Sequence, residues 1–198
     1  MSKGTQTREM ILERAAQLFS RRGYFGSSLA DIMHETGLEK GGIYNHFSSK
    51  EQLALEAFDY AYRLVQQRVQ AALQDKKHAV DRLLALVAVF ESVLEDPLVD
   101  GGCPVLNTAI EADDAQPALK ARAANAMDIW RDTFHRIIAK GIARQEVRPD
   151  VDADVVATLF ISMLEGAVMM SKLYGDFVHM HRVVDHLTHF IETSIRAY

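Results

Sequence analysis

The stretch "GLEKGGIYNHFSSKEQL", residues 37 to 53, combines two adjacent glycines with apolar side chains at helical spacing. Ile43 and Phe47 are four residues apart, which places them on one side of a helix. Gly41 and Gly42 each weaken a helix by about 1 kcal/mol relative to alanine. We therefore expect these glycines to leave a bare backbone that a binding partner approaches closely.

The residues on both sides of this stretch predict a helix-turn-helix. Ser27 and Ser28 can cap a preceding helix, which Gly37 ends. In the following "SSKEQL", Ser48 and Glu51 have the spacing of a capping box, which predicts the start of a longer helix. Two short helices joined by a tight turn are typical of DNA-binding units, in which the second helix enters the major groove.

Almost every other periodic segment also predicts a helix, and no strand alternation is visible. We expect an all-α protein of nine helices, with an N-terminal three-helix helix-turn-helix domain in residues 1–52 and a larger C-terminal helical bundle in residues 53–198. The first helix is expected to be capped by Thr5 or Thr7 and to end at Gly23. The later helices are expected near residues 48–73, 80–94, 104–112, 117–145, 153–173 and 178–197.

Composition favours a protein of the cytoplasm. The chain has 198 residues and a net charge of −5, but its first fifty residues carry +2 and the remainder −7. Its one cysteine, Cys103, excludes an intramolecular disulfide. No run of about 18 apolar residues predicts a membrane helix, and the N-terminus lacks the apolar core of a signal peptide. We expect no membrane partner.

Polar residues of the helix-turn-helix have the chemistry of DNA contacts. Lys40 can reach guanine edges or phosphate, and Asn45 can bond adenine. Tyr44, His46 and Lys50 can donate hydrogen bonds to phosphates. Leu38, Ile43 and Phe47 are expected to face a small core instead.

The stretch "TREMILERAAQLFSRRGYFGSSLADIMHETGLEKGGIYNHFSSKEQL" closely resembles the DNA-binding domain of TetR-family transcriptional regulators, over about residues 7 to 55. The resemblance implies that eight residues lie at the DNA surface: Ser28, Lys40, Gly41, Gly42, Tyr44, Asn45, His46 and Lys50. Two positions depart from the family pattern. Glu39 stands where many relatives have a capping serine or threonine, and Gly42 replaces a residue that often contacts a base.

The same resemblance implies what the rest of the chain does. It implies a ligand-responsive regulator, most often a repressor that a small-molecule effector releases from its operator. The expected partners are double-stranded DNA, a second copy of the chain and an effector of unknown identity. The apolar segments "VVATLFISMLEGAVMM" and "VVDHLTHFIETSI" predict a four-helix dimer interface formed by the last two helices of both subunits. Gly166 and Ala167 would allow close backbone approach there.

Candidates for effector binding are large adaptable side chains and one distinctive loop. A Met or aromatic stripe at helical spacing suits either an apolar ligand or an ordinary core. Cys103 follows two glycines at a helix start, which suits either a reactive thiol or a small buried residue, and the second reading is favoured. The eight candidates are Phe90, Cys103, Asn107, Met127, Trp130, Phe134, Met163 and Met170.

Other functions receive less support from the residues. A purely structural three-helix unit and an adaptor without DNA binding stay as alternatives. Enzyme signatures such as a nucleophile elbow, a phosphate loop or HExxH are absent from the sequence, so we expect neither an enzyme nor a cofactor. The histidines at 179, 181, 186 and 189 invite a metal site, but without a known ligand pattern we expect none.

Overall fold

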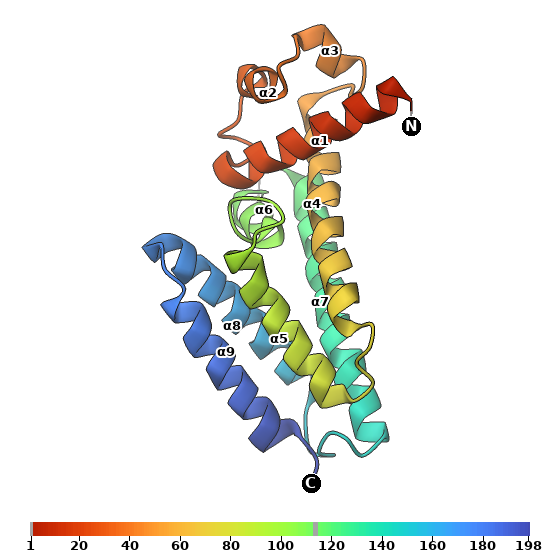
Figure 1. Ribbon diagram of the computed structural model, residues 1–198, viewed down its shortest axis with the longest axis vertical. Helices are drawn as coiled ribbons and strands as arrows, with labels where there is room; N and C mark the ends of the chain where they lie inside the picture. The colour runs from red at the N-terminus through yellow and green to blue at the C-terminus, as the bar shows by residue number, and fades with distance from the viewer. Residues whose placement is uncertain (1, 113–114) are drawn as a thin grey trace. The chain divides into compact units, whose positions relative to one another are not determined.

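The computed structural model describes residues 2–112 and 115–198, and most of these residues are helical (Figure 1). Within those ranges, strand pairing is limited to one isolated bridge between Val147 and Arg196. The helices are α1 (Lys3–Arg22), α2 (Leu29–Thr36), α3 (Lys40–Tyr44), α4 (Lys50–Leu73), α5 (Ala79–Glu95), α6 (Pro104–Ala112), α7 (Pro117–Ala143), α8 (Ala153–Tyr174), α9 (Val178–Phe190) and a π-helical turn, η1 (Ile191–Ile195). The all-α prediction is confirmed, with bounds mostly within two residues of those expected.

Two predicted helix starts are wrong. Helix α1 begins at Lys3 because Ser2, rather than Thr5 or Thr7, is its cap, and the Ser2 hydroxyl accepts the Thr5 N–H at 3.2 Å. Helix α4 begins one residue later than the predicted capping box requires. The Ser49 hydroxyl accepts the Gln52 N–H at 3.0 Å, and the Gln52 side-chain amide oxygen, Oε1, accepts the Ser48 N–H at 2.6 Å.

The last predicted helix is interrupted because its end pairs with another segment. Helix α9 ends at Phe190, and the π-helical turn closes with the Arg196 N–H donating to the Ile191 carbonyl at 2.9 Å. The Ile195 carbonyl accepts the Arg148 N–H at 2.9 Å, and the Ala197 N–H donates to the Glu146 carbonyl at 3.1 Å. These bonds to the α7–α8 connection replace a regular helix end.

The chain forms two compact units, each made of two segments. The first contains Met1–Leu64 and Leu98–Asn125, so α6 and the start of α7 belong with the helix-turn-helix. Helix α1 packs against α2, and α2 packs against α3. Its buried core consists of Ile11, Leu12, Ala15, Ala16, Leu18, Ile32, Ile43, Phe47, Leu53, Ala57, Ala61 and Val99.

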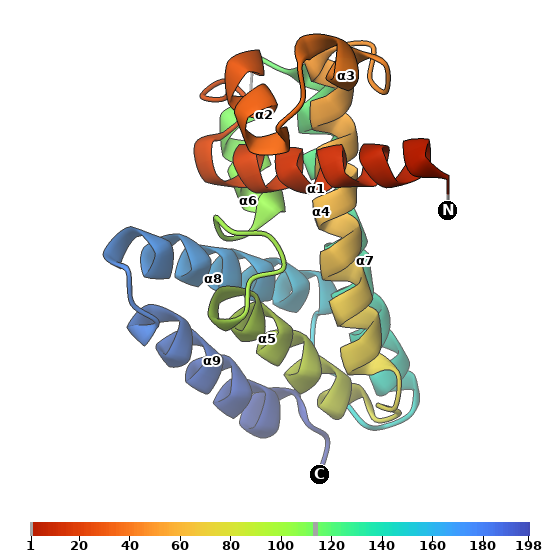
Figure 2. The same ribbon diagram turned by 45° about the horizontal axis from the view of Figure 1, so that its top comes forward.

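The second unit contains Val65–Pro97 and Ala126–Tyr198. Helices α8 and α9 are consecutive, antiparallel and packed on each other and on α5 (Figure 2). Gly175 ends α8 in the left-handed conformation, with φ of 72°, which permits the sharp reversal. Of the described helices, α8 alone is long and apolar enough to cross a membrane by length and composition, but 39% of its most apolar window is buried inside the protein. Such a pattern also fits a core helix of a water-soluble protein.

Candidate DNA-binding interface

Helix α2 is fixed at its start by a capping box. The Ser28 hydroxyl accepts the Asp31 N–H at 3.1 Å, and the Asp31 carboxylate accepts the Ser28 N–H at 2.7 Å. The predicted capping of this helix by Ser28 is confirmed. Arg22 also pairs with Asp31 at 2.9 Å. The hydrogen bonds from Ser28, together with Arg22, lower the pKa of the Asp31 carboxyl below its ordinary value.

Helix α3, which follows the turn after α2, is short and has no side-chain capping hydrogen bond. Gly37 adopts the left-handed conformation with φ of 66°, which ends α2. Glu39 precedes α3 and makes no side-chain capping bond, as its departure from serine or threonine suggested. Ile43 of α3 is 1% exposed, and Phe47, which was expected in this helix but follows its end at Tyr44, is also 1% exposed. Both therefore face the core as predicted. A helix of five residues has a weak dipole, so the interface depends mainly on the groups that α3 presents.

The residues predicted to face DNA are mostly at the surface. Lys40, Gly41 and Asn45 are exposed, as is Ser28 at the start of α2. Tyr44 is 36% exposed. Gly42, His46 and Lys50 are partly buried. Contact of these eight residues with DNA stays a prediction.

Neither glycine of α3 is demanded by the packing of the protein. A Cβ added at Gly41 meets nothing within 4 Å, and one added at Gly42 touches only the Leu38 side chain, at 3.4 Å or more. Folding would therefore accept alanine at position 41. The missing side chain instead leaves the backbone of α3 open to something outside the described chain.

Lys40 offers a positive charge beside this bare backbone. Its ammonium lies 5.7 Å from the centre of the Tyr44 ring, one helical turn away. Among the residues that the structure describes, no carboxylate forms an ion pair with Lys40. Its charge is available to a phosphate or a guanine edge.

Lys50, which was expected to donate to a phosphate, also makes contacts within the protein. Its ammonium donates to the Tyr24 carbonyl at 2.6 Å and lies 4.2 Å from the centre of the Tyr24 ring. Partial burial lowers the pKa of Lys50, while the Glu111 and Asp31 carboxylates oppose that change. Lys50 thus ties the start of α4 to the segment between α1 and α2, and so positions the helix-turn-helix.

Glu111 of α6 is a functional candidate that the sequence reasoning missed. Its two carboxylate oxygens accept the N–H groups of Tyr24 and Phe25, each at 2.8 Å. Gly23 lies against it, because an added Cβ would come within 2.4 Å of the carboxylate. These bonds join residues 86 and 87 positions apart, so no local pattern could have revealed them.

The loop before α6 makes further bonds to the end of α1. The Asn107 amide donates to the Gly101 carbonyl at 2.8 Å and to the Ser20 carbonyl at 3.3 Å. Gln17 accepts the Asp100 N–H at 3.0 Å. A Cβ at Gly101, where φ is 111°, would lie 2.3 Å from the Ser20 carbonyl oxygen. The loop and α6 are therefore fitted closely to the back of the helix-turn-helix.

The candidate effector residues divide between the two units. In the first, Cys103 is 4% exposed, and its sulfur accepts the Leu106 N–H at 3.5 Å at the start of α6. This geometry fits the favoured reading of a small buried residue. Asn107 holds the loop described above.

In the second unit, the aromatic candidates form part of the core. Phe90 packs edge-on against Trp130, with ring centres 5.4 Å apart, and Phe134 packs edge-on against Phe160 at 5.7 Å. Trp130 and Phe134 are buried. The three methionines of the predicted set, Met127, Met163 and Met170, are partly buried. Ligand contact by these residues stays a prediction.

The structure has two described cavities, and of the predicted effector-binding residues only Asn107 lines one of them. A cavity of about 40 Å³ in the first unit lies among α1, α4, α6 and α7, with Asn107 and Glu111 in its lining, and this volume suits water molecules only. A cavity of about 540 Å³ in the second unit is basic. Its lining consists of Lys77, Ala79, Arg82, Thr133, Arg136, Ile137, Lys140, Gly141, Arg144 and Glu146.

Two family models match successive parts of the chain. Residues 11–57 match the family described as "Bacterial regulatory proteins, tetR family". Residues 79–187, more than half of the chain, match the family described as "Tetracyclin repressor-like, C-terminal domain".

Individual relatives span nearly the whole chain. The crystal structure of a TetR transcriptional regulator from Chloroflexus aurantiacus J-10-FL has 47% sequence identity and a TM-score of 0.96, covering 100% of both chains. The uncharacterized HTH-type transcriptional regulator Rv0196 of Mycobacterium tuberculosis is 31% identical over 183 residues, 89% of each chain. The HTH-type transcriptional repressor DhaR of Mycobacterium sp. is 27% identical over 170 residues, 85% of this chain and 84% of the relative.

Proposed function

Because this chain belongs to the TetR family of bacterial transcriptional regulators, in which it is a DNA-binding regulator, we propose that it represses transcription as a homodimer that a small molecule releases from its operator. DNA binding is assigned to the helix-turn-helix of α2 and α3. The effector is assigned to the C-terminal part of the chain. The protein acts in the cytoplasm, where its DNA target lies.

The observation that carries this proposal is the set of hydrogen bonds that joins α6 to the helix-turn-helix and to the end of α1. Glu111 accepts two consecutive N–H groups just before α2, while the Asn107 amide donates to the Ser20 carbonyl at the end of α1. A ligand that shifts α6 by an ångström or two would break or redirect these bonds. A change in α6 would then alter the orientation of the DNA-reading helix, which is what release from an operator requires.

Dimerisation is supported by an apolar stripe on α8. The stripe consists of Val155, Leu159, Gly166, Met169 and Leu173, with Ser162 between them, and these positions recur at alternating spacings of four and three. That repeat brings one helix face against another. Val155, Leu159, Met169 and Leu173 of this stripe are at least half exposed. A row of exposed apolar side chains on one helix face is typical of an interaction surface, whereas isolated ones are common on monomers.

The centre of the stripe permits close approach of a partner helix. A Cβ at Gly166 meets nothing within 4 Å, whereas Ala167 is buried inside the subunit. Of the two small residues predicted to allow close backbone approach, Gly166 is therefore the one proposed to meet the partner. A twofold dimer would present two α3 helices to half-sites about 34–36 Å apart, or a multiple of that spacing.

The energy required for release is modest. Coupling between two ligand sites is typically about 1–3 kcal/mol, which changes affinity by about 5- to 150-fold. The effector therefore needs to bind the conformation that does not bind DNA more tightly than the other conformation, by a free energy of this size.

DNA titration at several salt concentrations tests the DNA-binding part. Purified protein is titrated against the labelled duplex flanking its own gene, and a shuffled duplex is the control. We expect saturable binding that weakens as salt rises, with a smaller salt dependence, by about one counterion, for Lys40→Ala. Equal affinity for the shuffled duplex would contradict sequence-specific regulation.

A thermal-shift screen tests the effector part, because a ligand of the folded protein raises its melting temperature. Each ligand that raises it is then added to the protein–DNA complex, and we expect at least one to release the duplex. Comparing Trp130→Ala with Arg136→Ala would distinguish the aromatic region from the basic cavity as its site. Ligands that bind tightly but leave DNA affinity unchanged would contradict an effector role.

A further inference from the structure

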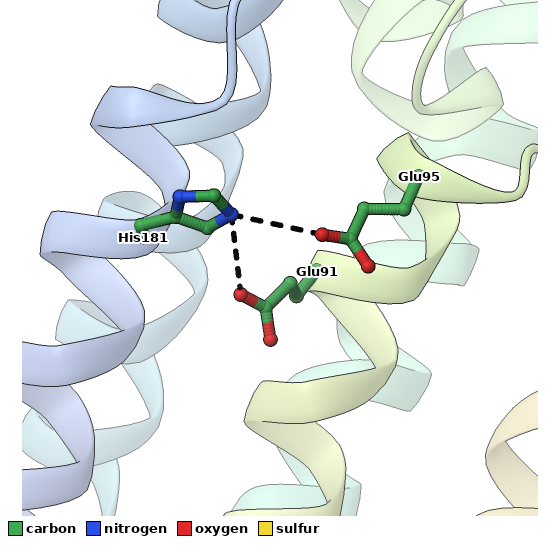
Figure 3. A group of neighbouring side chains, drawn as sticks. All are labelled: Glu91, Glu95 and His181. Carbon is green, nitrogen blue, oxygen red and sulfur yellow. Dashed lines mark ion pairs between the residues drawn. The ribbon is translucent and has the colours of Figure 1, made fainter.

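We propose that Glu91, Glu95 and His181 form a binding site for a divalent transition metal ion of the zinc type in the second unit. The three side chains point toward one another from two helices (Figure 3). One imidazole nitrogen and one oxygen of each carboxylate lie within 4.8 Å of one another. The site stands on this cluster alone and does not depend on the proposed function.

The backbone explains why these residues meet. Glu91 and Glu95 are four positions apart near the end of α5, so their side chains share one face of that helix. His181 lies in the first turn of α9, and α9 packs on α5. Two carboxylates come from one rigid element and the imidazole from another, which is how many metal sites join neighbouring helices.

The distances fit a shared metal ion better than direct hydrogen bonds. The His181 Nε2 atom lies 3.7 Å from Glu91 Oε1 and 3.6 Å from Glu95 Oε1. A good hydrogen bond between these atoms would be about 2.7–3.2 Å. In tetrahedral coordination with ligands at about 2.1 Å, neighbouring ligand atoms are about 3.4 Å apart. Small side-chain rotations would therefore place all three atoms around one ion.

Electrostatics also favours a cation between these groups. Two carboxylates one helical turn apart repel each other. In the described parts of the chain, the ion pairs of both Glu91 and Glu95 are with His181 alone. A neutral imidazole leaves their two negative charges uncompensated, and a divalent ion would neutralise both.

The donor atoms indicate the class of ion. One imidazole nitrogen with two carboxylate oxygens is a set found with Zn²⁺ in proteins, and imidazole also suits Ni²⁺ and Cu²⁺. Mg²⁺ and Ca²⁺ prefer oxygen ligands alone. The side chains of Glu91, Glu95 and His181 are 29%, 53% and 52% exposed, so water can complete the coordination.

Metal titration of the full-length protein, free of any tag and stripped with a chelator, tests the site. Zn²⁺ is titrated in competition with a coloured chelator, and Co²⁺ is titrated while visible absorption is followed. We expect one ion per chain, with the strong visible bands of low-coordinate Co²⁺. Glu91→Gln, Glu95→Gln and His181→Gln should each lower Zn²⁺ affinity by about tenfold or more.

His186→Gln is the matched control, because His186 is an exposed histidine of α9 outside the cluster. It should keep the wild-type Zn²⁺ affinity and the Zn²⁺-dependent rise in melting temperature. Circular dichroism of each variant without metal confirms that it is folded. Equal Zn²⁺ affinity in the wild type and the three cluster variants would overturn the site, as would the absence of saturable binding. Mg²⁺ binding as tight as Zn²⁺ binding would overturn the assigned class.

Discussion

At Gly41 an added side chain should have opposite effects on folding stability and on DNA binding. Its surroundings leave space for a side chain, and helical alanine loses less backbone entropy than glycine on folding. We predict that Gly41→Ala stabilises the protein by about 0.5 kcal/mol yet weakens operator binding several-fold, because the added methyl group holds α3 away from the duplex. Chemical denaturation and DNA titration measure the two effects.

Gly4→Ala in α1 is the matched control for this substitution. An added Cβ there comes no closer than 4.0 Å to the Ser2 hydroxyl, and the residue lies outside the helix-turn-helix. It should change stability in the same direction without changing DNA affinity. Unaltered operator affinity in Gly41→Ala would show that the bare backbone is not used.

The contribution of Asp31 to the stability of the folded protein depends on pH. Its pKa is lower in the folded protein than the unfolded value of about 3.9. The stabilisation is therefore fully present above that value and is lost as pH falls through the folded-state pKa. We predict that Asp31→Asn is less stable than the wild type at pH 6, and that the difference shrinks toward pH 3. Urea denaturation at several pH values measures it, and a constant difference would contradict this role.

At the level of whole elements, Glu111 links α6 to the segment that leads into α2. Hydrogen bonds to a charged group are worth about 1.5–3 kcal/mol each, and Glu111 accepts two. We predict that Glu111→Ala lowers the free energy of unfolding by about 3 kcal/mol and weakens operator binding, with Glu111→Gln intermediate. Denaturation and DNA titration measure both changes.

Glu13→Ala provides the control for Glu111, since Glu13 is an exposed glutamate of α1. It should leave stability and DNA affinity close to wild type. If Glu111→Ala bound DNA normally despite lower stability, α6 would have no role in orienting the reading helix.

The elements themselves were largely predictable because their signals are local. Gly23 and Gly37 end helices through their left-handed or open backbone, and the apolar spacing of Ile43 and Phe47 placed α3. The start of α4 was ambiguous, because two adjacent serines precede Glu51 and Gln52 and permit two capping registers. The structure uses Ser49 with Gln52.

The missed features depend on contacts between distant residues. The Glu111 bonds, the fit of Gly101 against Ser20 and the meeting of Glu91 with His181 all join residues that are far apart in the sequence. The early end of α9 likewise follows from bonds to Glu146 and Arg148. Periodicity reports which face of a helix is buried but not what lies against it.

For the whole molecule, the exposed stripe of α8 predicts how the chain associates. We predict that Leu159→Glu converts the proposed dimer to a monomer while helical content is kept, because Leu159 is 50% exposed in the single subunit. A charge at this position of the proposed interface would be buried without a partner. Sedimentation velocity measures the mass, and circular dichroism measures the fold.

Gln70→Glu is the corresponding control, as Gln70 is exposed on α4 outside the stripe. It should stay dimeric. The monomeric variant should also lose most operator affinity, since two half-sites can no longer be occupied together. A dimer that survives Leu159→Glu would place the interface elsewhere.

The fit of Gly101 against Ser20 has a genetic consequence. Any side chain at position 101 would collide with a backbone carbonyl, and its φ of 111° disfavours every other amino acid. A random-mutagenesis selection for constitutive expression of the target genes should thus recover alleles at codon 101 beside those in the codons for α3. Such alleles would leave every DNA-contacting group intact. A map of inactive alleles would therefore mark the residues that hold the helix-turn-helix in place as well as those that contact DNA.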